Sequence, residues 1–155
     1  MIAERPNLSL FCGRCFAHRE ASHATRLESH TVHGETFEAN IVTHDARRYA
    51  RNKGLVVAEP LLGLNAGTWG WLDFAFSASA WLKRAPEVAA ISIPVLVMGA
   101  EQEKLVDNAD QQLITARIPR GRWIEIPGAY HELFQETDAI RAVVWREVDG
   151  FVQAL

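Results

Sequence analysis

The last third of the chain alternates short apolar runs with amphipathic stretches. Residues 93–98 form a continuous, largely β-branched apolar run and residues 123–126 form a second one, so each predicts a strand buried on both faces. Asp107 or Asn108 can cap an intervening helix, and Thr137 can begin a final one. This order predicts a parallel strand pair with a right-handed crossover helix. Because two strands rarely form a stable parallel sheet alone, the pattern indicates part of a larger α/β fold.

Two further helices are predicted upstream of these strands. Thr43 can cap the first helix, and Pro60 ends it, because proline disfavours helical geometry in the residue before it. The second helix is predicted over about residues 68–83, where apolar residues recur at spacings of three and four and form a broad stripe. Such a stripe is typical of core packing, and the alternative is a lid whose aromatic side chains also line an apolar pocket. The aromatic candidates for that lining are Trp69, Trp71, Phe74 and Trp81.

Residues 1–36 have a different character, and their apolar residues follow no sustained period. They predict an irregular leader, with a short strand at residues 8–12 as the only regular element. Two chemical alternatives remain open there. Cys12, Cys15, His18 and His23 are zinc-type ligands, although their second spacing is shorter than a zinc finger needs. The turn around Cys15 could instead present a cysteine nucleophile after the short strand.

Size and charge exclude several classes of function. A chain of 155 residues suits one domain, and its formal net charge of −3 argues against a dedicated nucleic-acid-binding protein. The longest nearly uncharged apolar stretch, residues 88–100, is too short to span a bilayer, and the first residues do not read as a signal peptide. These features predict a cytoplasmic protein, and they leave peripheral contact with a membrane open.

Polar residues with catalytic chemistry follow both predicted strands. In open α/β sheets, functional residues gather in loops at the carboxyl ends of strands, where an acid after the first strand can meet His131 after the second. A carboxylate bound to one ring nitrogen fixes the histidine tautomer and frees the other nitrogen to act as a base. The acid is predicted to be Glu103, with Glu101 and Asp107 as alternatives within reach.

Five segments, taken together and in order, resemble a known family. They resemble the C-terminal half of bacterial α/β-hydrolases of the lysophospholipase and monoacylglycerol-lipase type, also described as serine aminopeptidase S33-type, over about residues 37–155. The segments are Thr43-His-Asp-Ala-Arg-Arg-Tyr49, Gly67-Thr-Trp-Gly-Trp71, Ile93-Pro-Val-Leu-Val97, Gly128-Ala-Tyr-His-Glu-Leu133 and Glu136-Thr-Asp-Ala-Ile-Arg141.

The resemblance implies a fold and a division of labour within it. Residues 37–90 would form a helical cap that lines the substrate site, and residues 91–155 the terminal β-α-β-α unit of the hydrolase core. His131 would be the histidine of a Ser-His-acid triad and Glu103 its acid, although the family usually has Asp there and often Gly at the position of Glu101. The implied substrate is a lipid ester, and no cofactor is implied.

The family's nucleophile is the feature that the sequence does not match. That serine sits in a Gly-x-Ser-x-Gly elbow upstream of the cap, and none of the six serines present has this context. We therefore expect a C-terminal portion of the fold that is inactive by itself and either pairs with a complementing N-terminal half or self-associates. The alternative function is a non-catalytic binding or interaction module that uses the Trp-rich cap.

Overall fold

The computed structural model describes residues 36–63 and 68–155, and the statements below concern those residues. The predicted short strand and the zinc and cysteine-nucleophile candidates of the leader lie outside the described residues. The proposed division into leader, cap and core stays a prediction.

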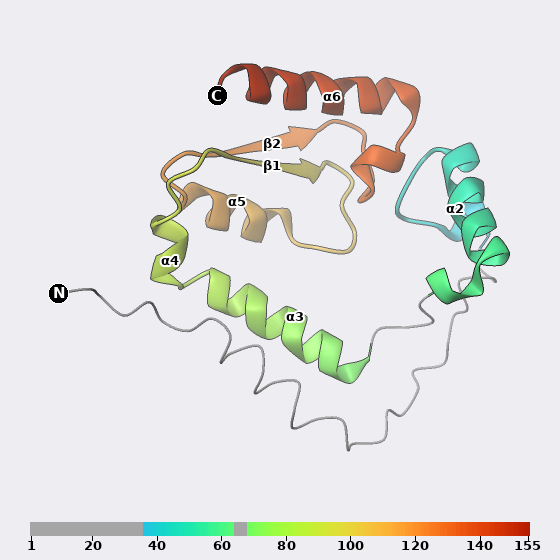
Figure 1. The fold of residues 1–155 in the computed structure, drawn as a ribbon, viewed down its shortest axis with the longest axis horizontal. Coiled ribbons are helices and arrows are strands. Elements are labelled where there is room, and N and C mark those ends of the chain that lie inside the picture. The colour runs from blue at the N-terminus through green and yellow to red at the C-terminus, as the bar shows by residue number, and fades with distance from the viewer. Residues whose placement is uncertain (1–35, 64–67) are drawn as a thin grey trace.

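The centre of the described fold is a parallel pair of strands. Strand β1 (Val95–Ala100) pairs with β2 (Gly121–Ile126) in a register that sets Val95 opposite Gly121. Helix α5 (Asn108–Ala116) connects them and lies on one face, while α6 (Asp138–Gln153) covers the other (Figure 1). The predicted parallel pair is therefore confirmed. The first strand begins two residues later than predicted, where Val95 makes its first ladder bond, because Pro94 has no N–H to donate.

Two apolar clusters hold these layers together. The first lies between the sheet and α6 and centres on Ile126 and Val144, both fully buried. The second lies on the α5 side, where Ile118 and Val95 pack against Val88 of the short helix α4 (Pro86–Ala89). Burying apolar side chains on both faces of the strands supplies the main stabilisation of this unit.

Helix α2 (Ala46–Ala58) lies beyond the carboxyl ends of both strands (Figure 1). Its cap differs from the sequence prediction, because the Asp45 side chain, and not that of Thr43, accepts the N–H groups of Arg47 and Arg48. The Thr43 hydroxyl instead accepts from the Asp45 N–H and donates to the carbonyl of Gln135. The helix begins at Ala46, so Asp45 and not Thr43 stands at the N-cap position. The Thr43 hydroxyl joins the start of the helix to the distant Gln135 instead.

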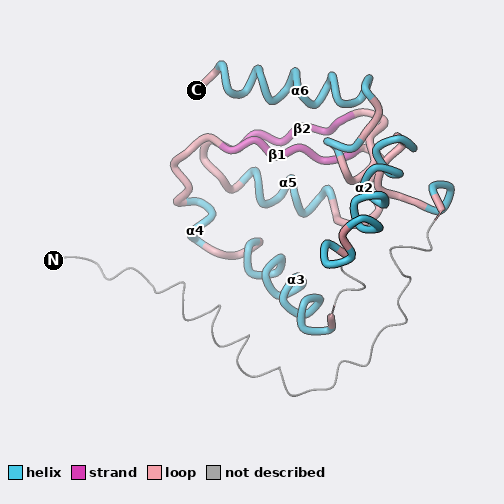
Figure 2. The backbone as a smooth tube through the Cα atoms, turned by 45° about the vertical axis from the view of Figure 1, so that its right-hand side comes forward, coloured by secondary structure: helices cyan, strands magenta, loops and turns pink. Residues whose placement is uncertain are grey.

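Helix α3 (Trp69–Leu82) lies on the far side of α5 from the sheet (Figure 2). The helix predicted over about residues 68–83 is present, and Thr68 caps its N-terminus by accepting the Trp71 N–H at 3.1 Å. Its C-terminal end is attached to α5 by Arg117, which donates to the carbonyls of Leu82 and Ala85 at 2.6 Å each. No residue of α3 is buried by the described part of the chain.

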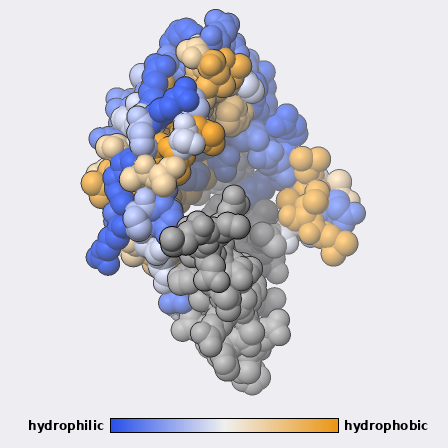
Figure 3. All heavy atoms as spheres, turned by 60° about the vertical axis from the view of Figure 1, so that its left-hand side comes forward, coloured by the Kyte–Doolittle hydropathy of each residue, from blue (hydrophilic) through white to orange (hydrophobic). Residues whose placement is uncertain are grey.

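Hydrophobic side chains consequently reach the surface at several separate places, as the face in Figure 3 illustrates. Three single turns of 3-10 helix complete the described elements, at Phe37–Ala39, Pro60–Leu62 and Leu133–Gln135 (η1, η2 and η3). Among residues 36–63 and 68–155, no helix combines the length and apolarity needed to cross a bilayer.

Candidate active site

Two loops meet at the carboxyl ends of the strands. The loop after β1 begins with Glu101, whose N–H donates to the carbonyl of Ile126, and continues with Gln102, whose N–H donates to that of Ala129 at 2.9 Å. The loop after β2 turns at Gly128, which has a positive φ of 70°. The backbone pairing thus continues beyond the sheet and brings the two loops together.

Glu103 and His131 form the central contact of these loops. Oε2 of Glu103 lies 2.8 Å from Nδ1 of His131, while Oε1 accepts the N–H groups of Lys104 and Leu105 at 2.9 and 2.8 Å. The carboxylate is only 5% exposed, whereas the His131 side chain is 32% exposed. Because a carboxylate only accepts hydrogen bonds, Nδ1 carries the proton and Nε2 is left as the basic nitrogen.

The electrostatics of Glu103 favour its charged form. Burial raises the pKa of its carboxyl, but the hydrogen bonds from the Leu105 N–H and from His131, together with the His131 charge, outweigh burial and lower the pKa below its usual value. An ionised carboxylate is the form that orients an imidazole and stabilises its protonated state.

The two alternative acids are engaged elsewhere. Oε2 of Glu101 accepts the Gly128 N–H at 2.7 Å, and Asp107 caps α5 by accepting the Ala109 N–H at 2.8 Å. The structure therefore confirms the predicted contact between Glu103 and His131. The part that this pair takes in catalysis stays a prediction.

The four aromatic candidates for the substrate lining all lie on α3. Their exposed fractions run from 44% to 59%, so they are not buried as a structural core stripe would be. This exposure argues against simple core packing within the described residues. Their contact with a substrate stays a prediction for Trp69, Trp71, Phe74 and Trp81.

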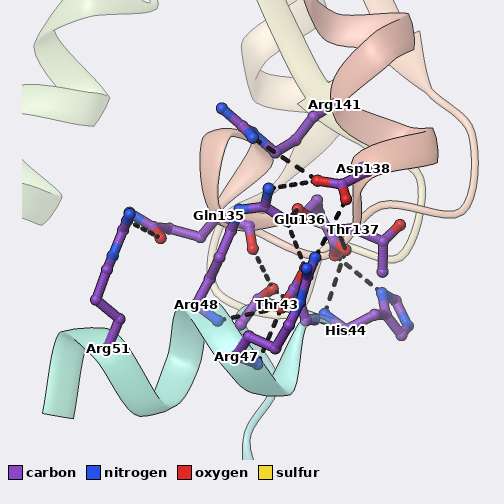
Figure 4. Close-up of polar contacts among 11 residues, drawn as sticks. Thr43, His44, Arg47, Arg48, Arg51, Gln135, Glu136, Thr137, Asp138 and Arg141 are labelled. Carbon is purple, nitrogen blue, oxygen red and sulfur yellow. Dashed lines mark hydrogen bonds and ion pairs between the residues drawn. The ribbon is translucent and has the colours of Figure 1, made fainter. Parts of the chain in front are cut away.

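A second polar cluster lies beside the first and was not predicted. Glu136, fully buried between η3 and α6, lies 2.9 Å from Nδ1 of His44 through Oε1 (Figure 4). The same oxygen accepts the Tyr130 N–H at 2.8 Å. Both segments, Thr43-His-Asp and Glu136-Thr-Asp, carry the family resemblance, but only their proximity in space shows that they pair.

Ion pairs extend this cluster to the surface. Asp45 bonds Arg47 and Arg48, and both arginines also reach Asp138 at the start of α6. The side-chain hydrogen bond from Arg47 is the largest cause of a pKa of Asp45 far below its usual range, although burial opposes it. These contacts join the start of α2 to the start of α6.

No metal centre forms in the described part of the chain. Among residues 36–63 and 68–155, no three His, Cys, Asp or Glu side chains gather closely enough to hold a metal ion. The zinc-type residues of the leader are outside those ranges.

Comparison with known proteins decides the family. The profile of the family described as serine aminopeptidase, S33 matches residues 6–138. The chain belongs to this family. The match begins well upstream of residue 37, so the family likeness includes most of the predicted irregular leader.

Two curated relatives of this S33-family chain are lysophospholipases by name. It is 36% identical to a probable lysophospholipase L2 of Haemophilus influenzae over 94 residues, which are 60% of this chain and 29% of the relative. It is 32% identical to lysophospholipase L2 of Escherichia coli K12 over 123 residues, 74% of this chain and 35% of the relative. The chain therefore spans about a third of the length of the curated relatives it matches.

A solved structure shows the same fold. A soluble variant of monoglyceride lipase from Saccharomyces cerevisiae, in complex with a substrate analog, superposes with a TM-score of 0.60 at 17% identity, over 74% of this chain and 40% of the lipase. The predicted fold class, part of an α/β-hydrolase fold, is confirmed.

Proposed function

We propose that this chain supplies the histidine and the acid of a serine hydrolase that cleaves carboxylic esters of lipids. The observation that carries the proposal is the 2.8 Å contact between Glu103 and Nδ1 of His131 at the carboxyl ends of two parallel strands. That location is where open α/β sheets place their functional groups. The relatives' names, lysophospholipase L2 and monoglyceride lipase, support lysophospholipid or monoacylglycerol as the substrate.

The proposed chemistry divides between the two residues. Nε2 of His131 takes the proton of the attacking serine hydroxyl and later delivers it to the leaving alcohol. Glu103 holds the ring in the tautomer that leaves Nε2 basic, and its negative charge stabilises the imidazolium that forms. The lowered pKa of Glu103 supports this role, because the carboxyl stays ionised throughout the neutral range.

The nucleophile in this proposal comes from outside the 155 residues. None of the six serines stands in a Gly-x-Ser-x-Gly sequence, and the curated relatives are about three times as long as the region they share with this chain. A complementing N-terminal half that carries the elbow is therefore the proposed partner, and without it we expect only background ester hydrolysis.

The proposed place for the acyl chain is beside α3. Four of its aromatic side chains are exposed, and an apolar, aromatic surface suits the burial of an acyl chain. The same surface would make peripheral contact with a lipid aggregate that presents the substrate. The proposed residues are Trp69, Trp71, Phe74 and Trp81.

A chimera tests the proposed function. The region of Escherichia coli lysophospholipase L2 that aligns with this chain, 35% of its length, is replaced by the aligned residues of the chain, and fatty-acid release from a lysophospholipid is measured. We expect activity that falls by roughly 10⁶-fold in His131→Ala and by roughly 10⁴-fold in Glu103→Gln. Glu132→Gln is the matched control, because it makes the same change of charge next to His131 at an exposed side chain.

An active chimera that retains its activity in His131→Ala would refute the proposal.

The second candidate function, a non-catalytic module that binds apolar ligands through α3, is favoured by the observation that none of the residues of α3 is buried. It predicts an inactive chimera together with a 155-residue chain that binds lysophospholipid micelles and loses this binding in Trp71→Ala.

A further inference from the structure

Glu136 is a buried carboxylate to which the proposed catalytic steps assign no part. Its side chain is fully buried, and its two oxygens accept four hydrogen bonds. Oε1 accepts from the Tyr130 N–H at 2.8 Å and from the His44 ring at 2.9 Å. Oε2 accepts from the backbone N–H groups of Thr137 at 3.1 Å and His44 at 3.2 Å. Burying a carboxylate is costly unless donors surround it, and here the donors come from three separate segments of the chain.

The donors place Glu136 at the joint between α2 and the His131 loop. Both neighbours of His131 are tied there through their backbone: Tyr130 donates to Glu136, and Glu132 donates to the carbonyl of Val42 at 2.9 Å. His44, the residue next to the Asp45 cap of α2, is fixed by Glu136 through its ring and its N–H (Figure 4). The backbone before His131 is thus held by the side chain of Glu136, and the backbone after it by the main-chain carbonyl of Val42.

The ring of Tyr130 extends this joint to the acid loop. The His44 ring stacks on it at 3.8 Å between centroids and 20° between planes. Lys104, which follows Glu103 in the chain, places its ammonium 4.7 Å from the Tyr130 ring centroid. Tyr130 directly precedes His131 in one loop, and its ring contacts Lys104 in the loop that carries Glu103.

We infer that Glu136 is a positioning residue that holds the His131 loop in register with Glu103 and locks that register to the entry of α2. The inference rests on the proposed function, because it assigns Glu136 a part in setting the base that the hydrolase would use. A purely structural carboxylate would stabilise the fold without altering the hydrogen bond of His131. The Nδ1–H of His131 is therefore the group to observe.

The test is proton NMR of the full 155-residue chain, with the low-field Nδ1–H resonance of His131 assigned by its loss in Glu103→Gln. Glu136→Gln keeps the size of the side chain but turns an NH₂ group toward N–H donors. We expect the exchange of the His131 Nδ1–H with solvent to accelerate by about tenfold or more in this variant. Glu132→Gln, with the same change of charge, is expected to leave the exchange rate unchanged.

Native amide resonances of α6 establish that each variant is folded. A folded Glu136→Gln variant whose His131 Nδ1–H keeps the parent chemical shift and exchange rate would overturn the inference.

If Glu136→Gln does not fold, His44→Phe replaces it, because a phenyl ring keeps the stack on Tyr130 and removes the hydrogen bond to Glu136. Faster exchange of the His131 Nδ1–H in His44→Phe then supports the inference, and an unchanged rate overturns it. No ester is involved, so these outcomes are independent of whether the chimera hydrolyses lysophospholipid.

Discussion

Oε2 of Glu101 accepts the backbone N–H of Gly128 at 2.7 Å, although 27 residues separate them along the chain. This bond closes the turn that carries β2 into the His131 loop. Gly128 occupies that turn with a φ of 70°, a backbone conformation that residues with a Cβ rarely adopt. Glu101 is not paired with His131, but it thereby supports the loop that carries His131.

The turn at Gly128 should be sensitive to a single methyl group. No atom lies within 4 Å of a Cβ added there, so the cost of Gly128→Ala is the backbone conformation alone, about 1–2 kcal/mol. The melting temperature measured by circular dichroism should fall by about 2–8 °C. Gly150→Ala, inside α6 and equally free of close atoms, should instead raise it, because alanine favours a helix by about 0.5–1 kcal/mol. Equal shifts in both variants would contradict this account.

The Glu103–His131 pair should appear in the pH dependence of stability. The folded state lowers the pKa of Glu103, so its contribution is complete above the unfolded value of about 4.3 and is lost as the pH falls through the folded pKa. The parent's advantage over Glu103→Gln in free energy of unfolding should therefore shrink between pH 7 and pH 3, as measured by urea titration. Glu132→Gln, which changes an exposed carboxylate next to His131, is measured alongside as the control. A constant difference for Glu103→Gln would show that the carboxylate gains nothing from its partners.

The cap of α2 should be worth more than an ordinary helix cap. Asp45 accepts two backbone N–H groups and also pairs with Arg47 and Arg48. Asp45→Ala should lower the free energy of unfolding by about 2 kcal/mol, the upper end for a lost cap. Asp107→Ala removes the single-bond cap of α5 and should cost about 1 kcal/mol. Chemical denaturation of both variants gives the comparison, and a larger loss for Asp107→Ala would count against a contribution from the arginines.

The α3 aromatics should discriminate between acyl chains in the lysophospholipase L2 chimera. Trp71→Ala removes apolar surface that we propose contacts a long acyl chain, so kcat/KM should fall about tenfold on long-chain esters and little on short ones. Phe76→Ala, on the same helix but outside the predicted stripe, is the control and should affect both alike. Equal losses on long and short esters in Trp71→Ala would indicate a folding role for Trp71.

Local patterns along the chain were sufficient for the elements and for the main contact of the site. Apolar runs and cap residues predicted α3, α5, α6 and both strands, because these signals depend on neighbours within a few residues. Parallel strands place their carboxyl ends at one edge of a sheet, so two loops 28 residues apart could be paired from the order of the elements, and Glu103 meets His131 there. The family likeness also followed from motifs in their order, as the S33 match shows.

Tertiary structure decided what depends on residues far apart in the chain. Thr43 reads as a helix cap in isolation, but its hydroxyl donates to the carbonyl of Gln135, 92 residues away, and Asp45 caps α2 instead. The pairing of His44 with Glu136 spans the same separation, and no periodicity or spacing encodes it. A buried carboxylate is stable only where several donors converge on it, and that convergence exists only after the start of α2 has packed against the start of α6.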